Sequence, residues 1–214
     1  EYVGGQSLSN RGKTVIVDYL SAKLFSKLRS VGFYREAHIE ALSYVPDGAG
    51  LFLDVGCASG MISVEAAKKG YRVIGIDKNQ LSIEAAKKYA ELCGVNVDFK
   101  AIELSKLDFK ANVVCASSLL AVMPDRVAGL KALFGAVKKG GYLVVIEPTD
   151  AMTVKNGRSY AKRHNLKQRQ WLCMWAFARQ NNIVDSSIYE LLGAEKIDCD
   201  FVLDGMLGVW IIKK

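Results

Sequence analysis

The sequence predicts an α/β fold with a doubly wound, mostly parallel sheet. Apolar runs of strand length alternate with helical patterns between residues 51 and 149, as in chains of strand–helix–strand units. Two further strand-like runs, Ile197–Leu203 and Met206–Ile212, flank Asp204-Gly205, a hairpin signal. The length of 214 residues suits one well-packed domain. We therefore expect one parallel sheet that ends in an antiparallel hairpin.

Two helices are predicted ahead of the first strand. Apolar residues recur at helical spacing between Thr14 and Arg29. A second helix is expected from Phe33 to Tyr44 and is ended by Pro46 and the glycines beyond it. These helices could close over a ligand or cover the sheet edge, and the sequence favours neither interpretation.

A buried strand, a tight turn and a helix are predicted over residues 51–69. Leu51–Val55 is the strand, the small residues Gly56–Gly60 form the turn, and Met61–Lys69 has a helical pattern. Small residues let backbone N–H groups approach a ligand, and a helix N-terminus favours a carboxylate or phosphate. A nucleotide-like cofactor is therefore the first hypothesis for this turn.

The second strand, Tyr71–Ile76, ends in an acidic residue. Asp77 follows Gly56 by 21 residues, close to the spacing expected of a carboxylate that accepts both ribose hydroxyls. Nicotinamide dinucleotides and S-adenosylmethionine both carry ribose. The dinucleotide pattern G-x-G-x-x-G would need glycines where Ala58 and Met61 stand, so this cofactor class is disfavoured.

Further strand and helix patterns follow in alternation. A helix is expected over Leu81–Leu92, with Gly94 as its stop, and another from Pro124 to Val137, with Gly140-Gly141 after its end. The remaining strands are expected at Val95–Ala101, Ala111–Ala116 and Tyr142–Ile146. Ligands of open α/β sheets bind at the carboxyl ends of strands, so acceptor chemistry is expected just after residue 116.

The segment Asp54-Val55-Gly56-Cys57-Ala58-Ser59-Gly60 resembles motif I of the class I, Rossmann-like S-adenosylmethionine-dependent methyltransferases, D/E-x-G-x-G-x-G, with Ala58 replacing the middle glycine. The resemblance extends from about Leu51 to the C-terminus. It implies a seven-stranded sheet of order 3-2-1-4-5-7-6 with N-terminal cap helices, and S-adenosyl-L-methionine as cofactor.

The resemblance also implies a role for each residue of the first turn. Gly56, Ala58 and Gly60 would let the backbone approach the methionyl part of the cofactor. Asp54 would orient the turn or hold the ammonium group, while Cys57 is interpreted as a small filler rather than a nucleophile.

The other implied cofactor contacts come from later strand ends. Asp77, followed by Lys78, would bind the ribose, and Ser117 would touch the methionyl end. Glu103 would accept a hydrogen bond from the adenine amino group, and Leu104 would supply an N–H group and an apolar wall. A solvated loop glutamate is the alternative interpretation of Glu103.

The net charge of +7 is concentrated in one segment. Residues 151–184 contain seven lysines and arginines and no acidic residue. A solvated basic face is one interpretation, and a lid that binds an anionic or amphipathic small acceptor, with Trp171 and Trp175 as walls, is the leading functional one. Nucleic acid is the third. The apolar residues expected on one helical side are Leu166, Trp171, Cys173, Met174, Phe177 and Ala178.

An oxygen or carbon acceptor needs a base, whereas positioning and exclusion of water help every methyl transfer. The chain has two histidines, His38 and His164. We predict His164 as the catalytic residue because it lies in the basic segment, with His38, Tyr34 and Tyr160 as alternatives.

Residues 117–120 lack the proline and aromatic pattern of enzymes that methylate nucleobase or glutamine amino groups, which argues against that subclass.

Composition narrows the remaining classes. No apolar run is long enough to span a membrane. Five scattered cysteines without a C-x-x-C pair predict neither a disulfide framework nor a metal site. With no signal peptide pattern at the start, these cysteines favour the cytoplasm.

We therefore predict a single methyltransferase domain over residues 1–214. It comprises cap helices (1–48), a cofactor-binding core (49–149), a basic helical lid insertion (150–184) and a terminal helix with the hairpin (185–214). The predicted function is S-adenosylmethionine-dependent methyl transfer to a small-molecule acceptor. The alternative is an RNA-associated methyltransferase, or a cofactor-binding protein without activity, that uses the basic segment 155–179.

Overall fold

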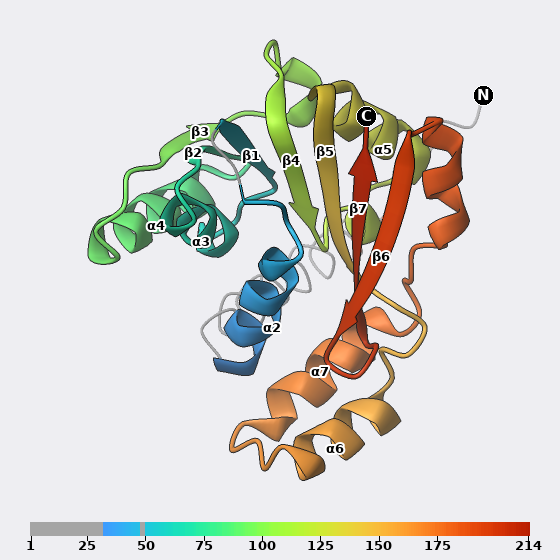
Figure 1. Ribbon diagram of the computed structural model, residues 1–214. Helices are drawn as coiled ribbons and strands as arrows, with labels where there is room; N and C mark the ends of the chain where they lie inside the picture. Colours follow the sequence, from blue (N-terminus) through green and yellow to red (C-terminus); the bar gives the residue numbers. More distant parts are fainter. Residues whose placement is uncertain (1–31, 48–49) are drawn as a thin grey trace, which may run out of the picture.

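A computed structural model describes residues 32–47 and 50–214. One seven-stranded sheet of order β3-β2-β1-β4-β5-β7-β6 forms its centre (Figure 1). The five strands β3, β2, β1, β4 and β5 pair in parallel with their neighbours. Strand β7 runs antiparallel to both β5 and β6. The strand order and the terminal hairpin are as predicted. The strands are β1 (Leu51–Val55), β2 (Arg72–Asp77), β3 (Asp98–Ala101), β4 (Ala111–Ser117), β5 (Val137–Pro148), β6 (Lys196–Val202) and β7 (Leu207–Lys213).

Helices cover both faces of this sheet. Alternate residues of β5 divide between two cores, with Val144 and Ile146 in one and Leu143 and Val145 in the other. The first core packs against α2, α3 and α7, and the second against α5 and η3. This burial of both faces explains the continuous apolar runs of the central strands. The helices are α2 (Gly32–Ser43), α3 (Met61–Lys68), α4 (Gln80–Leu92), α5 (Arg126–Gly135), α6 (Val154–Arg163) and α7 (Arg169–Arg179), with 3-10 helices η1 (Leu104–Lys106), η2 (Leu120–Val122) and η3 (Ser186–Leu192).

The cap region is described only in part. The helix predicted over Thr14–Arg29 lies outside the described residues. The one predicted over Phe33–Tyr44 is α2, which buries Phe33, Tyr34 and other residues in the first core and also buries His38. In the described part of the chain, no helix combines the length and apolar character that crossing a bilayer requires.

Strand β5 begins earlier than predicted. The helix predicted from Pro124 to Val137 is α5, but it ends at Gly135, and β5 already starts at Val137. The predicted end of this helix and its glycine stop were therefore wrong. A Cβ atom on Gly141 would lie 2.4 Å from the backbone oxygen of Asn112, and the Gly140 N–H donates to the oxygen of Lys214. Gly141 therefore allows close approach of the neighbouring strand, and Gly140 adopts a left-handed φ of 73° with open space around it. Neither glycine ends the helix.

The basic segment folds into two helices, and the buried side differs from the predicted one. Asn165 adopts a left-handed backbone with φ of 47°, which separates α6 from α7. The buried positions of α7 are Leu172, Trp175, Ala176 and Arg179, at the spacing of one helical face. Phe177, predicted on the apolar side, is 70% exposed because it lies off this face.

Candidate active site

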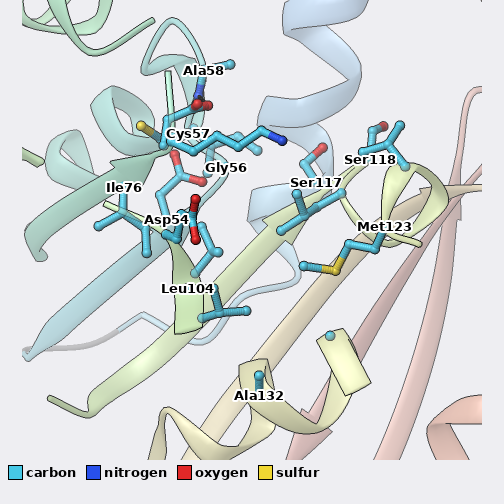
Figure 2. A pocket seen from close by; sticks show the side chains of 18 of the residues that line it. Asp54, Gly56, Cys57, Ala58, Ile76, Leu104, Ser117, Ser118, Met123 and Ala132 are labelled. Carbon is cyan, nitrogen blue, oxygen red and sulfur yellow. Dashed lines mark hydrogen bonds between the residues drawn. The ribbon is translucent and has the colours of Figure 1, made fainter. Parts of the chain in front are cut away.

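A pocket of about 860 Å³ lies at the carboxyl ends of the parallel strands, where open α/β sheets bind ligands (Figure 2). Its volume is in the range of small-molecule sites. Residues that follow β1, β2, β3 and β4 form one part of the wall, and α2, α5 and Arg179 of α7 complete it. Eight of the nine predicted cofactor residues line it: Asp54, Gly56, Ala58, Asp77, Lys78, Glu103, Leu104 and Ser117.

The turn after β1 is held against β2 by its backbone. The N–H groups of Gly56 and Cys57 both donate to the carbonyl of Ile76, at 2.8 and 2.9 Å. Gly56 has a left-handed φ of 72°, and a Cβ atom there would lie 3.1 Å from Leu119 across the pocket. A side chain would therefore both strain this turn and narrow the pocket.

Gly60, the ninth predicted residue, lies behind the turn and not in the pocket wall. Its φ is 78°, and a Cβ atom would lie 2.8 Å from Cζ of Phe99 and 2.9 Å from Cβ of Ala86. The structure therefore does not support the predicted contact of Gly60 with the methionyl part of the cofactor. This glycine lets α3 begin close to α4 and β3.

Ala58 occupies the middle glycine position in a left-handed conformation. Its φ is 49°, a region that costs an alanine roughly 1 kcal/mol. Its N–H donates to Oδ2 of Asp77 at 3.0 Å. The hydrogen bond helps to hold the conformation that a glycine would adopt without strain.

Asp77 is fixed by two backbone groups. Besides Ala58, the N–H of Asn79 donates to its other oxygen, Oδ1, at 2.8 Å, and Asn79 in turn caps α4. A carboxylate has about four lone-pair positions, so both oxygens can accept further hydrogen bonds from a pair of hydroxyl groups. The exposed Lys78 lines the pocket next to it.

Asp54 is a buried carboxyl at the base of the turn. It is 2% exposed, and the hydroxyl of Ser63 donates to its Oδ2 at 2.6 Å. Burial raises the pKa of Asp54 to about 7, and the Ser63 hydrogen bond opposes this. A ligand cation at this point would favour the charged carboxylate and lower its pKa.

Part of the pocket wall forms an apolar slot. Ile76 and Leu104 come from one side of it, and Met123 and Ala132 from the other (Figure 2). Glu103 is exposed at the rim, directly before η1. The wall from Met123 and α5 was missed by the sequence analysis, because it depends on how α5 packs against the sheet.

His38 of α2 reaches the pocket beside Ser117. Its Nδ1 lies 2.7 Å from the backbone oxygen of Tyr34, and its Nε2 lies 2.9 Å from Oγ of Ser117. Burial lowers the pKa of His38 to about 4, so the ring is neutral at pH 7. Because a carbonyl only accepts, Nδ1 carries the proton and Nε2 accepts from the Ser117 hydroxyl. The rings of Tyr34 and Trp175 pack beside it.

His164, the predicted catalytic residue, is not brought to this pocket. It is exposed at the end of α6, where its ring stacks on Tyr160 at a centroid distance of 4.1 Å. The turn between α6 and α7 lies away from the strand ends (Figure 1). Of the seven basic residues of this segment, all of them described, Arg179 alone lines the pocket.

Arg179 places a buried cation at the edge of the pocket. It is 8% exposed, and burial lowers its pKa while the nearby Glu147 opposes that shift. Glu147 is fully buried at the end of β5, and its Oε1 accepts the N–H of Leu120 at 2.7 Å. Burial raises the pKa of Glu147 to about 7.

Metal-binding and disulfide chemistry have no support in the described residues. No group of three or more His, Cys, Asp or Glu side chains there could hold a metal ion. All five cysteines belong to the described residues, and none of them forms a disulfide with another.

Comparison with known proteins gives a family match and several structural matches. A family model described as a methyltransferase domain matches residues 47–190. None of the curated proteins compared with the chain matches its sequence. At 12 to 20% identity, the structural matches show the fold alone.

Three solved structures illustrate that fold. The plantazolicin methyltransferase BpumL, in complex with a monoazolic desmethylPZN analog and SAH, gives a TM-score of 0.67 at 14% identity, covering 93% of this chain and 92% of its own. Magnesium protoporphyrin IX methyltransferase (ChlM) from Synechocystis PCC 6803, with bound SAH, gives 0.65 at 14% identity, covering 94% and 99%. The N-methyltransferase NodS from Bradyrhizobium japonicum WM9, in complex with SAH, gives 0.61 at 16% identity, covering 88% and 90%.

Proposed function

This chain belongs to the methyltransferase domain family, and we propose that it transfers a methyl group from S-adenosyl-L-methionine to a small-molecule acceptor. When bound, this cofactor supplies an electrophilic methyl group on a positively charged sulfur. The main support for this proposal is that the turn after β1, Asp77 and Ser117 all line the same pocket. These residues come from the ends of three neighbouring strands, β1, β2 and β4.

The residues present fit this cofactor. The left-handed turn at Gly56 and Ala58 keeps side chains away from the methionyl part, and Asp54 is available for its ammonium group. Asp77, held by two N–H groups, would accept the ribose hydroxyls, with Lys78 beside it. Glu103 and Leu104 would bind the adenine at the apolar slot.

The acceptor would lie between β4, α2 and α7. Ser117 and His38 form one wall of this part of the pocket, and Arg179 contributes a buried positive charge. Tyr34 also lines this part of the pocket, and the buried Trp175, which does not line it, packs against the Tyr34 ring with a centroid distance of 4.9 Å. A cation beside aromatic side chains suits an anionic or amphipathic acceptor. In this view, α2 and the end of α7 at Arg179 form the acceptor side of a single domain, and α6 lies away from it.

The alternatives drawn from the sequence receive less support. The family match is to a methyltransferase domain, which disfavours a nicotinamide dehydrogenase. An RNA acceptor would be expected to use the basic segment, yet only Arg179 of that segment reaches the pocket. We expect the protein to act in a reducing cytoplasm, because its five cysteines are odd in number, scattered and without a C-x-x-C pair.

Calorimetry with three ligands tests the proposal. We expect S-adenosyl-L-methionine and S-adenosyl-L-homocysteine to bind with one site per chain, and NAD to give no binding heat. Binding of NAD in preference to both adenosyl ligands would overturn the proposal. A salt-dependent RNA mobility shift, competed by S-adenosyl-L-homocysteine, would instead favour the RNA alternative.

A further inference from the structure

We propose that Ser117 and His38 form a proton relay, and that the methyl acceptor is therefore a hydroxyl group. The inference rests on the proposed function, because it names the acceptor class of the same pocket. It is carried by the order of hydrogen bonds that joins the pocket to a buried neutral imidazole.

The direction of these hydrogen bonds is fixed at one end. The backbone oxygen of Tyr34 can only accept, so the Nδ1 of His38 donates to it. The remaining ring nitrogen, Nε2, has a lone pair and accepts from the Ser117 hydroxyl. Ser117 has thus used its proton, and because the residue lines the pocket, the remaining lone pairs of its hydroxyl oxygen can accept from a donor on the ligand.

A hydroxyl acceptor needs such an arrangement more than an amine does. A neutral amine attacks with its free lone pair and can release its proton to water after the transfer. An alcohol or phenol would become a strongly acidic oxonium unless its proton left as the new bond formed. A carbon acid would also need a base, but its C–H group donates no comparable hydrogen bond to Ser117. A hydrogen-bond acceptor connected to the free lone pair of an imidazole is therefore matched to an O–H group.

The relay balances in atoms and charge. A lone pair of the acceptor oxygen forms the bond to the methyl carbon, while the electron pair of the carbon–sulfur bond stays on sulfur. The acceptor proton passes to Oγ of Ser117, and the Ser117 proton passes to Nε2 of His38. His38 becomes an imidazolium as the positive charge on sulfur is lost, so the total charge of the pocket is unchanged.

The elements that pack near His38 carry several ionisable groups. Carboxylates among them would favour the imidazolium and cations would oppose it, by amounts that fall with distance, whereas the tyrosines are neutral. Tyr34, Asp54 of β1 and Arg179 of α7 line the same pocket as His38, and the other groups are Glu36 and Glu40 on α2, Glu147 at the end of β5 and Tyr160 on α6.

The same hydrogen bonds could serve only to fix α2 to β4, since His38 and Ser117 are 79 residues apart. A purely structural role predicts that mutation lowers stability and nothing else. A relay predicts in addition that the acid dissociation constant of His38 responds to the charge on the cofactor sulfur. It also predicts that replacing His38 changes the pH dependence of the reaction. These two responses separate the interpretations.

Histidine NMR provides the first test, because the chain has only two histidines. With ¹⁵N-histidine label, His164→Gln removes one set of signals and leaves those of His38. We expect the Nδ1–H tautomer, with an Nε2 shift that changes in Ser117→Ala. We also expect the acid dissociation constant of His38 to be at least about threefold larger with S-adenosyl-L-methionine bound than with S-adenosyl-L-homocysteine, because only the former carries a positive sulfur. An Nε2–H tautomer, or equal constants in two complexes that calorimetry shows to be saturated, would overturn the relay.

Turnover provides the second test. A panel of phenols, alcohols and primary amines is assayed for formation of S-adenosyl-L-homocysteine. We expect methylation of hydroxyl acceptors, with kcat reduced at least about a hundredfold in His38→Gln and Ser117→Ala but not in His164→Gln. Methylation of amines alone, at rates that His38→Gln leaves unchanged, would overturn the relay and leave the proposed function intact. Failure of both adenosyl ligands to bind would overturn the proposed function itself, and the relay with it.

Discussion

The backbone N–H of Ala58 donates a hydrogen bond of 3.0 Å to Oδ2 of Asp77. The turn after β1 and the end of β2 are thus joined by the carboxylate that we propose as the ribose ligand. Its second oxygen is also bound, by the N–H of Asn79. One side chain therefore shapes the turn and presents lone pairs to the pocket.

Replacing Asp77 should weaken the cofactor complex. We expect Asp77→Ala to reduce the affinity for S-adenosyl-L-methionine by at least about tenfold, because hydrogen bonds to the ribose and to the turn are both lost. Isothermal titration calorimetry measures this, with the exposed Asp108→Ala as the matched control. An affinity within twofold of the wild type would refute the ribose role.

The left-handed conformation of Ala58 makes a prediction about stability. Ala58→Gly should raise the free energy of unfolding by about 0.5 to 1 kcal/mol, because glycine adopts a positive φ without strain. Urea denaturation measures the change. The control is Ala85→Gly, on the exposed side of α4, which should lower the same quantity by a similar amount. Equal destabilisation by both substitutions would contradict the argument.

Glu103 should distinguish adenine from a base without an amino group. Hypoxanthine has an oxygen where adenine has that donor, and this oxygen would repel the carboxylate. We expect the wild type to bind S-adenosyl-L-homocysteine at least about fivefold more tightly than S-inosyl-L-homocysteine, and Glu103→Ala to show a clearly smaller preference. Some preference should remain, because N1 of hypoxanthine carries a hydrogen and cannot accept from the Leu104 N–H. Glu84→Ala, on the surface of α4, should keep the full preference. If Glu103→Ala also kept the full preference, Glu103 would be a solvated loop residue.

The buried Glu147 makes stability depend on pH. Burial raises its pKa from 4.5 to about 7, so the folded protein holds this proton more tightly than the unfolded chain. Its contribution to stability is complete below pH 4.5 and is lost as the pH rises toward 7. Glu147→Gln should therefore reduce the fall in unfolding free energy between pH 5 and pH 8, by up to about 3 kcal/mol.

Urea denaturation at the two pH values checks this expectation. The exposed Glu190→Gln serves as the control and should leave the pH dependence unchanged. Asp54, whose pKa is also raised to about 7, remains in both variants and should preserve part of the fall. A pH dependence identical in the wild type and Glu147→Gln would show that Glu147 is charged at no cost in the folded protein.

The sheet could be predicted because its signals are local. Each central strand is a short apolar run ended by small or polar residues, and the hairpin around Asp204-Gly205 is marked by its turn. The positions of Asp77 and Ser117 follow from strand order alone, because parallel strands end at the same edge of the sheet.

The acceptor side could not be predicted in the same way. The choice of His164 over His38 assumed that the basic segment covers the pocket, whereas the break at Asn165 turns α6 and its end away from it. The place of His38 depends on the packing of α2 against β4 and α7, between residues far apart in sequence. Spacing along the chain carries no signal for such contacts.

The position of β7 between β5 and β6 has a consequence for synthesis of the protein. The 12-residue strand β5 leaves the ribosome well before its partner, because residues 149–206 must be translated in between. At typical bacterial and eukaryotic rates this takes on the order of several seconds, during which an apolar strand edge has no partner. The nascent chain is therefore exposed to aggregation at this edge, and chaperones that bind extended apolar segments would be needed most while the α6–α7 segment is being made.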